Sequence, residues 1–178
     1  MAFIPRLTDA GMMNNPYWYS DNYFYQIGYG LPNCTCYALG RWIELFRLDG
    51  SQDYPDVSHG NANTWFGHPD DYERGQIAKL GAIACWYSTD DPSGAPGHVG
   101  VVEVIHDDGS YTVSNSNYGA EYFITYRIYN NYLGANWEFQ GFIYNPHVDG
   151  GGSKFNIVLA GNILKRRKDN GKTIFYTR

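Results

Sequence analysis

The sequence predicts an α+β fold in which one N-terminal helix precedes an antiparallel β-sheet. Apolar residues recur at three- and four-residue steps over residues 34–48, the spacing of an amphipathic helix. From residue 79 onward, β-rich runs alternate with turn residues, and residues 106–109 read His-Asp-Asp-Gly between two such runs, a hairpin signal. A helix followed by a meander of strands is typical of the α+β class.

The predicted helix begins after Pro32, with Asn33 as its N-cap. Its apolar face comprises Ala38, Leu39, Trp42, Ile43 and Phe46, and we expect its charged residues on the surface: Arg41, Glu44 and Arg47. Gly40 within a helix costs about 1 kcal/mol relative to alanine, so it predicts close approach by another element.

Strands are predicted at residues 81–87, 98–105, 110–115, 121–129 and 140–144. The polar stretch 49–78 is predicted to be a loop with one short helix. Residues 14–30 are dense in aromatic side chains, which suit either a cover over the core or the wall of a groove for an extended ligand.

The chain of 178 residues, 43% hydrophobic, can form one globular domain with a core. We predict a catalytic domain at 1–146, a glycine-rich linker at 147–153, and a basic segment at 154–178. That segment is read as a tail, an edge strand of the sheet, or the stump of a further domain. No apolar run is long enough for a membrane span, and no secretory signal is recognised at the start.

Charge is divided unevenly along the chain. Residues 1–153 are predominantly acidic, which argues against nucleic acid as the main partner. The basic segment is predicted to bind a polyanion, with a solvated charged tail as the alternative. Three cysteines make a disulfide scaffold improbable, and Cys85, in an apolar run, is expected to be an inert buried thiol.

A cysteine at a helix start and a histidine at a strand start form the candidate site. Cys34 would occupy the first helical turn, where unpaired N–H groups and the helix dipole favour a thiolate and could hold an oxyanion. His98 would serve as the base for this nucleophile and, when protonated, would lower its pKa further. This predicts hydrolysis through a covalent thioester.

The hairpin supplies the group that orients His98. If a four-residue loop closes it, Ile105 pairs with Ser110, which puts His98 opposite Asn117 and Gly100 opposite Asn115. An amide oxygen can accept the imidazole proton and fix its tautomer. Asn115 is the predicted orienting residue, and Asn117 is a second one or a substrate contact. The other predicted substrate contacts are Asn33, Tyr118 and Trp65.

Other chemistries fit less well. The spacing of Cys34 and Cys36 matches no standard zinc pattern, and the two diverge by about 200° on a helix. There is no G-x-S-x-G motif and no P-loop. We therefore expect neither a metal nor another cofactor.

These motifs resemble the CHAP family, the cysteine-, histidine-dependent amidohydrolases/peptidases. The nucleophile motif Gln/Asn-Cys-Thr-Trp-Tyr-Ala corresponds to residues 33–38, and Gly-His-Val-Ala/Gly-Val-Val corresponds to residues 97–102. The family segment that carries the third catalytic residue, the one that orients the histidine, corresponds to residues 114–118. The strand before the histidine corresponds to residues 81–84, and the closing Phe-Ile-Tyr-x-Pro run to residues 142–146. The resemblance covers about residues 14–146.

The resemblance implies a papain-like fold and cleavage of peptidoglycan, at a peptide bond or at the muramoyl–alanine amide. It also implies a phage endolysin or tail-associated lysin, released through a holin or carried in a virion, that acts at the bacterial wall. Asn115 stands where many members have Glu, and Cys36 replaces the usual Trp. Residues 25–29 lack the Asp-x-Asp that binds calcium in some members. The alternative function is a non-catalytic wall-binding or virion structural module.

Overall fold

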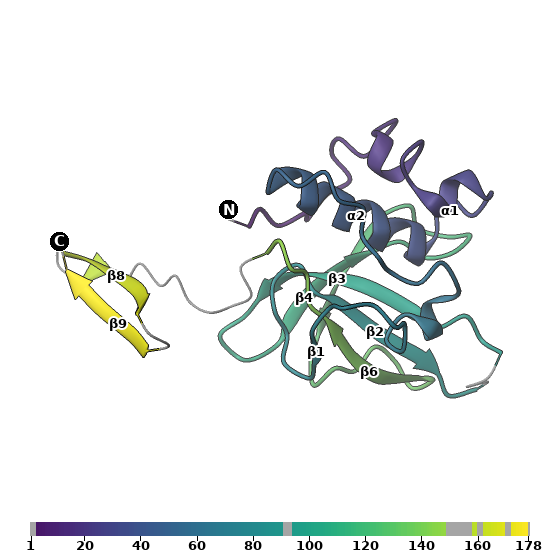
Figure 1. Ribbon diagram of the computed structural model, residues 1–178. Coiled ribbons are helices and arrows are strands. Elements are labelled where there is room, and N and C mark those ends of the chain that lie inside the picture. The colour runs from purple at the N-terminus through teal and green to yellow at the C-terminus, as the bar shows by residue number, and fades with distance from the viewer. Residues whose placement is uncertain (1–2, 91–93, 149–157, 160–161, 170–171, 178) are drawn as a thin grey trace.

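The computed structural model describes residues 3–90 and 94–148, together with the strands of the C-terminal segment. Helix α2 (Cys34–Leu48) packs on one face of a six-stranded antiparallel sheet, which confirms the α+β prediction (Figure 1). The shorter helices are η1 (Pro16–Trp18), α1 (Tyr23–Gln26) and η2 (Ala62–Thr64).

Helix α2 begins and ends where its sequence signals predict. Asn33 is its N-cap, and its side-chain oxygen accepts the Thr35 N–H at 3.0 Å. Gly40 lies against the indole of Trp18: a Cβ added at this glycine would lie 2.4 Å from the ring. The close approach predicted at Gly40 is therefore confirmed, and η1 is the element that approaches.

The sheet has the order β1-β6-β2-β3-β4-β5. Its strands are β1 (Arg74–Gly75), β2 (Ile83–Ser88), β3 (His98–Ile105), β4 (Tyr111–Asn115), β5 (Ile124–Ile128) and β6 (Trp137–Ile143). Strands β2 to β5 form the expected meander, whereas β6 returns to pair with β2. Phe139 and Phe142 of β6 pack with Trp86 of β2 in one apolar cluster, so this position lets β6 bury its aromatic side chains.

The hairpin of β3 and β4 has a longer loop than predicted and a compensating bulge. Ile105 pairs with Tyr111 and not with Ser110. The register then shifts between Val102 and Val104, so that Glu103 is the extra residue. Beyond the bulge Val101 pairs with Ser114, the register that places Gly100 opposite Asn115 as predicted. The predicted pairing of His98 with Asn117 lies past the end of β4.

Apolar clusters cover both faces of the sheet. Between α2 and the sheet, Trp42 is fully buried and its indole donates to the Gly81 carbonyl at 2.8 Å. On the other face, Trp86, Val102 and Phe142 are buried beneath side chains from β5, β6 and the loop between them. One face of the sheet therefore packs against α2, and the opposite face carries Trp86 with His98 beside it.

Arg41 departs from its predicted surface position. Its side chain is 2% exposed and forms an ion pair with Glu103 of β3. This prediction was wrong because helical spacing could not reveal that a carboxylate would lie on the facing strand. An arginine can be buried when such a partner satisfies its charge and its N–H groups.

The C-terminal segment contains β7 (Val158–Leu159), β8 (Asn162–Asp169) and β9 (Lys172–Thr177). These strands form a three-stranded antiparallel sheet of their own, so none of the three is an edge strand of the main sheet. Most of the predicted linker lies outside the described residues. Val148 is described; it is buried and lies against Gly81, so the packed domain continues at least this far.

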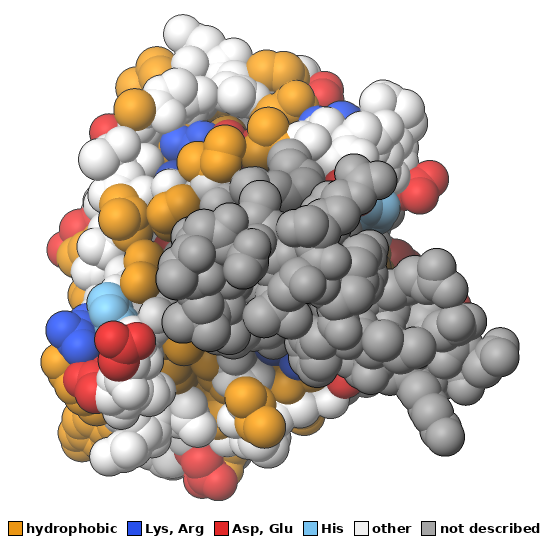
Figure 2. Space-filling model, turned by 90° about the vertical axis from the view of Figure 1, so that its left-hand side faces the viewer, with side chains coloured by type: hydrophobic (Ala, Val, Ile, Leu, Met, Phe, Trp, Pro, Cys, Tyr) orange, Lys and Arg blue, Asp and Glu red, His pale blue; other side chains and the backbone are white. Residues whose placement is uncertain are grey.

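The described surface mixes charges and apolar side chains. On the face drawn in Figure 2, acidic, basic and hydrophobic side chains are interspersed over the part that is described. Within the described residues, no helix has the length and apolar character to cross a bilayer.

Candidate active site

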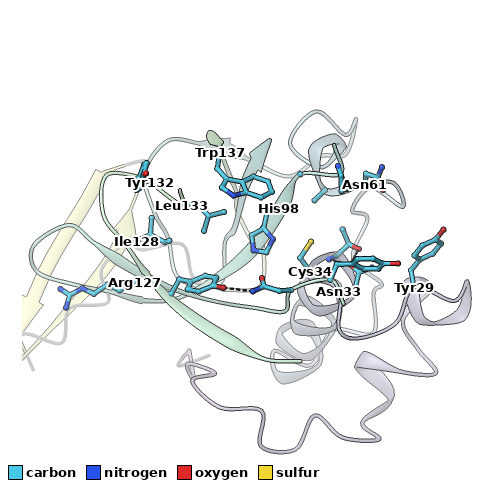
Figure 3. A pocket seen from close by; sticks show the side chains of 17 residues that line it. Tyr29, Asn33, Cys34, Asn61, His98, Arg127, Ile128, Tyr132, Leu133 and Trp137 are labelled. Carbon is cyan, nitrogen blue, oxygen red and sulfur yellow. Dashed lines mark hydrogen bonds between the residues drawn. The ribbon is translucent and has the colours of Figure 1, made fainter. Parts of the chain in front are cut away.

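A groove of about 860 Å³ lies where the N-terminus of α2 meets the start of β3 (Figure 3). Five of the predicted site residues line it: Asn33, Cys34, His98, Asn117 and Tyr118. The groove thus joins segments that are more than 60 residues apart in the chain. In Figure 3 the sulfur of Cys34 and the ring of His98 point toward one another across it.

Cys34 is the first residue of α2 and is 8% exposed. Burial raises the pKa of its thiol to about 11, although hydrogen bonds from the backbone of Val99, Thr35 and Cys34 itself lower it. The thiolate expected at the helix start is therefore disfavoured, because desolvation outweighs the N–H groups that stabilise the charge. Val99 is the residue after His98, so the Cys34 thiol lies beside the strand that this histidine opens.

His98 opens β3 and is held between indoles. The ring centroids of Trp86 and Trp137 lie 6.3 and 5.9 Å from the imidazole centroid. Gly97 precedes it with φ +76°, and a Cβ there would lie 2.5 Å from the Asn63 backbone nitrogen. Only glycine fits this bend, which turns the chain into β3 beside η2. Burial lowers the pKa of His98 to about 4, so the imidazole is neutral at pH 7.

Asn115, the last residue of β4, faces His98. The interaction of its side chain with the imidazole raises the His98 pKa, against the larger effect of burial. Asn115 Oδ1 is buried and has no hydrogen bond of normal geometry within the described part of the chain. Its Nδ2 donates to the Ile124 carbonyl at 3.4 Å, which leaves the oxygen available to the imidazole.

Asn117 and Tyr118 lie on the rim of the groove. Asn117 Nδ2 donates to Glu121 Oε2 at 2.8 Å and to the Tyr126 hydroxyl at 2.7 Å, contacts that hold it against β5. Tyr118 is 72% exposed. The Gly119 N–H donates to the Pro32 carbonyl at 3.3 Å, which brings this turn beside the segment that precedes Cys34.

Trp65 was wrongly predicted to contact substrate. Its side chain is fully buried, stacks on Phe24 with 6.1 Å between centroids, and donates to the Gly60 carbonyl at 3.3 Å. The loop coils into η2, which turns the indole into the core. Asn61 and Ala62 of the same loop line the groove in its place.

The other two thiols are fully buried, as expected for Cys85. Burial raises the pKa of Cys36 to about 12, and that of Cys85 further still. Cys36 Sγ donates to the Trp18 carbonyl at 3.7 Å, a packing role under η1. Cys34 is therefore the most acidic and the most accessible of the three cysteines. Residues 3–90 and 94–148 contain no group of three or more His, Cys, Asp or Glu side chains that could hold a metal ion.

The sequence analysis did not predict the residues that line one half of the groove. On the His98 side the lining is largely apolar, from β5, the start of β6 and the loop between them: Tyr126, Ile128, Tyr132, Leu133 and Trp137 (Figure 3). Alternation in β5 could have shown that Tyr126 and Ile128 share a face. Nothing local indicates that this face lies beside His98.

Residues 22–117 match the CHAP domain family. The chain belongs to this family. The match contains Cys34, His98, Asn115 and Asn117. The CHAP chain is 36% identical over 90 residues to the "Probable autolysin LDP" of Staphylococcus aureus, covering 51% of this chain and 29% of that protein.

A solved structure with similarity to this CHAP chain is an N-acetylmuramoyl-L-alanine amidase from Staphylococcus aureus. The two are 23% identical, with a TM-score of 0.43 over 76% of this chain and 37% of that one. The CHAP chain therefore spans only about a third of the length of either matched protein.

Proposed function

We propose that this CHAP domain is a cysteine hydrolase of bacterial peptidoglycan that cuts a peptide or amide bond. The observation that carries the proposal is the shared groove, where the Cys34 thiol lies beside Val99, the residue after His98, and points toward the imidazole ring. Family membership supports it, and so does the resemblance to a protein named a probable autolysin.

In the proposed reaction the two groups start neutral. With pKa values of about 11 and 4, thiol and imidazole are both uncharged at pH 7. Cys34 Sγ attacks the carbonyl carbon while His98 takes the thiol proton, so the charges form together and adjacent to each other. The amine leaves with the proton from His98, and a thioester remains on Cys34. Water, deprotonated by His98, then attacks the thioester and releases a carboxylic acid and the thiol.

The oxyanion formed during each attack needs N–H donors near Cys34. The Thr35 N–H already donates to Asn33 Oδ1 at 3.0 Å, so we assign the Cys34 N–H as the donor of α2 to the oxyanion. Asn115 orients the imidazole through its side-chain oxygen. As an amide, it stabilises the imidazolium less than a carboxylate would, in keeping with the low pKa of His98.

The groove favours an uncharged segment of substrate. Its described lining includes no carboxylate, and its single lysine or arginine, Arg127, is already paired with Asp108 at 2.9 Å. Asn33, Tyr118 and Asn117 are proposed substrate contacts on the polar rim. The basic segment 154–178 is proposed to hold anionic wall polymers, which predicts retention that weakens with salt. Origin from a phage lysin stays a prediction of the family resemblance.

Clearing of Gram-positive walls tests the proposal. Cys34→Ser and His98→Ala should each abolish clearing while the circular dichroism spectrum is unchanged. Cys36→Ser is the matched control, because it removes a thiol two residues away that is fully buried. Full lytic activity of either site variant would refute the assignment. Mass spectrometry of released fragments then distinguishes an amidase, which frees alanine at the sugar junction, from an endopeptidase.

A non-catalytic wall-binding module is the second candidate. The observation in its favour is that burial disfavours both the thiolate and the imidazolium. It predicts binding of intact walls by the wild type and by Cys34→Ser alike, with no fragment released by either. Release of fragments by the wild type alone would dismiss it.

A further inference from the structure

A fully buried carboxylate lies between the elements that carry the candidate site. Glu103 of β3 has a side chain that is 0% exposed, and its Oε1 and Oε2 accept two N–H bonds from Arg41, at 3.0 and 2.9 Å. Oε1 also accepts the Ser114 hydroxyl at 2.7 Å, and Oε2 accepts the Arg6 backbone N–H at 2.8 Å. Four donors satisfy this carboxylate, which is what a buried charge requires.

Three of the four donor groups come from α2 and β4, elements that carry site residues, and the fourth is the Arg6 backbone N–H. Arg41 lies on α2 seven residues after Cys34, which is two helical turns and therefore the same face of the helix. Helix α2 packs along β3, and the Arg41–Glu103 ion pair lies two helical turns from the Cys34 thiol. A directional contact at this distance from the thiol helps to fix the position and the rotation of the helix over the strand.

Strand β4, the third element, is joined to Glu103 through Ser114. This residue immediately precedes Asn115 on β4, and its hydroxyl bonds to the same carboxylate oxygen as Arg41 Nε. Glu103 is also the extra residue of the bulge that sets the register Val101–Ser114. The strand distortion that turns Glu103 toward α2 therefore also aligns the end of β4 with the start of β3.

We propose that Glu103 is a positioning residue for the Cys34–His98–Asn115 site, an inference that rests on the proposed function. One carboxylate contacts α2 through Arg41 and β4 through Ser114, and itself belongs to β3. It thereby holds the nucleophile, the base and the orienting amide in mutual alignment. A buried ion pair adds little net stability compared with apolar packing, so its contribution lies in the geometry it imposes.

Alkylation of Cys34 tests this without any substrate. The rate of modification by iodoacetamide at pH 7 is followed by peptide mass spectrometry for the wild type, Glu103→Gln, His98→Ala and the double variant. Glu103→Gln keeps the shape of the side chain and removes its charge. Asp70→Asn is the matched control. The Asp70 side chain is 1% exposed, and its carboxylate is bonded to Arg74 and to the Tyr72 N–H, outside α2, β3 and β4.

His98→Ala should slow the alkylation of Cys34 by about tenfold or more, because the thiol loses its base. Glu103→Gln should slow it by about tenfold through misalignment, and Asp70→Asn should leave it unchanged. The double variant should match His98→Ala within about twofold, because without the imidazole there is no base left to misalign. A purely structural role for Glu103 predicts multiplied effects in the double variant, or no effect at all, and either result overturns the proposal.

The alkylation rates distinguish failure of the proposed Cys34–His98 pair from failure of the proposed role of Glu103. A rate unaffected by His98→Ala would remove the Cys34–His98 pair itself, whereas a rate slowed by His98→Ala but not by Glu103→Gln would remove only the role of Glu103. Should Glu103→Gln not fold, Ser114→Ala removes one donor and keeps the ion pair. It should slow alkylation by about twofold to fivefold, again without adding to His98→Ala. An unchanged rate in folded Ser114→Ala overturns the proposal.

Discussion

Acidification from pH 7 to pH 4 should destabilise the folded domain through His98, and the size of the loss follows from its burial. The imidazole is 9% exposed, and burial lowers its pKa from 6.5 to about 4. The unfolded chain therefore takes up a proton below pH 6.5 that the folded chain takes up only near pH 4. The contribution is complete above pH 6.5 and is lost progressively between 6.5 and 4. The difference between these pKa values corresponds to about 3 kcal/mol of unfolding free energy.

Urea unfolding at pH 7, 5.5 and 4 measures this loss, with wild type compared with His98→Gln. The glutamine cannot titrate, so the variant should lose about 3 kcal/mol less than the wild type between pH 7 and pH 4. His59→Gln, at an exposed histidine, is the matched control. Parallel stability curves for wild type and His98→Gln would refute the reasoning, because His98 would then titrate alike in the folded and unfolded chains.

Two further predictions concern the packing of α2 and the orienting amide. Gly40→Ala should destabilise the domain by about 1–3 kcal/mol in urea unfolding, because its Cβ would lie 2.4 Å from the buried Trp18 ring. Gly67→Ala, with nothing within 4 Å, is its control, and a more stable Gly40→Ala would contradict the close approach. Asn115→Asp should place a carboxylate beside His98, raise the pKa of the imidazole and move the acid limb of the lytic pH profile upward. An acid limb that does not move would mean that residue 115 does not contact His98.

Local sequence signals predicted the elements that carry the site. The Asn33 cap and the apolar spacing placed the helix at 34–48, and the structure has it at the same residues. The run that opens at His98 predicted β3 with the same bounds. These predictions succeed because capping, helical periodicity and β-rich runs depend on residues close together in the chain.

Other features depended on partners that are distant in sequence. Arg41 was expected at the surface, yet Glu103, 62 residues away, allows it to be buried. Trp65 was expected in the groove, yet the fold of its loop turns it into the core. The hairpin register at Asn115 was predicted correctly although its loop was not, because the bulge at Glu103 offsets the extra loop residue.

The sequence by itself determined that a cysteine opens a helix, that a histidine opens a strand, and that an amide follows in a hairpin. Only the tertiary structure decided that the cysteine and the histidine share a groove, that burial leaves the thiol and imidazole neutral, and that one carboxylate joins the three elements. The physical reason is that chain-local preferences set secondary structure. Burial, by contrast, and with it each pKa and each buried ion pair, depends on which surfaces meet when the helix packs on the sheet.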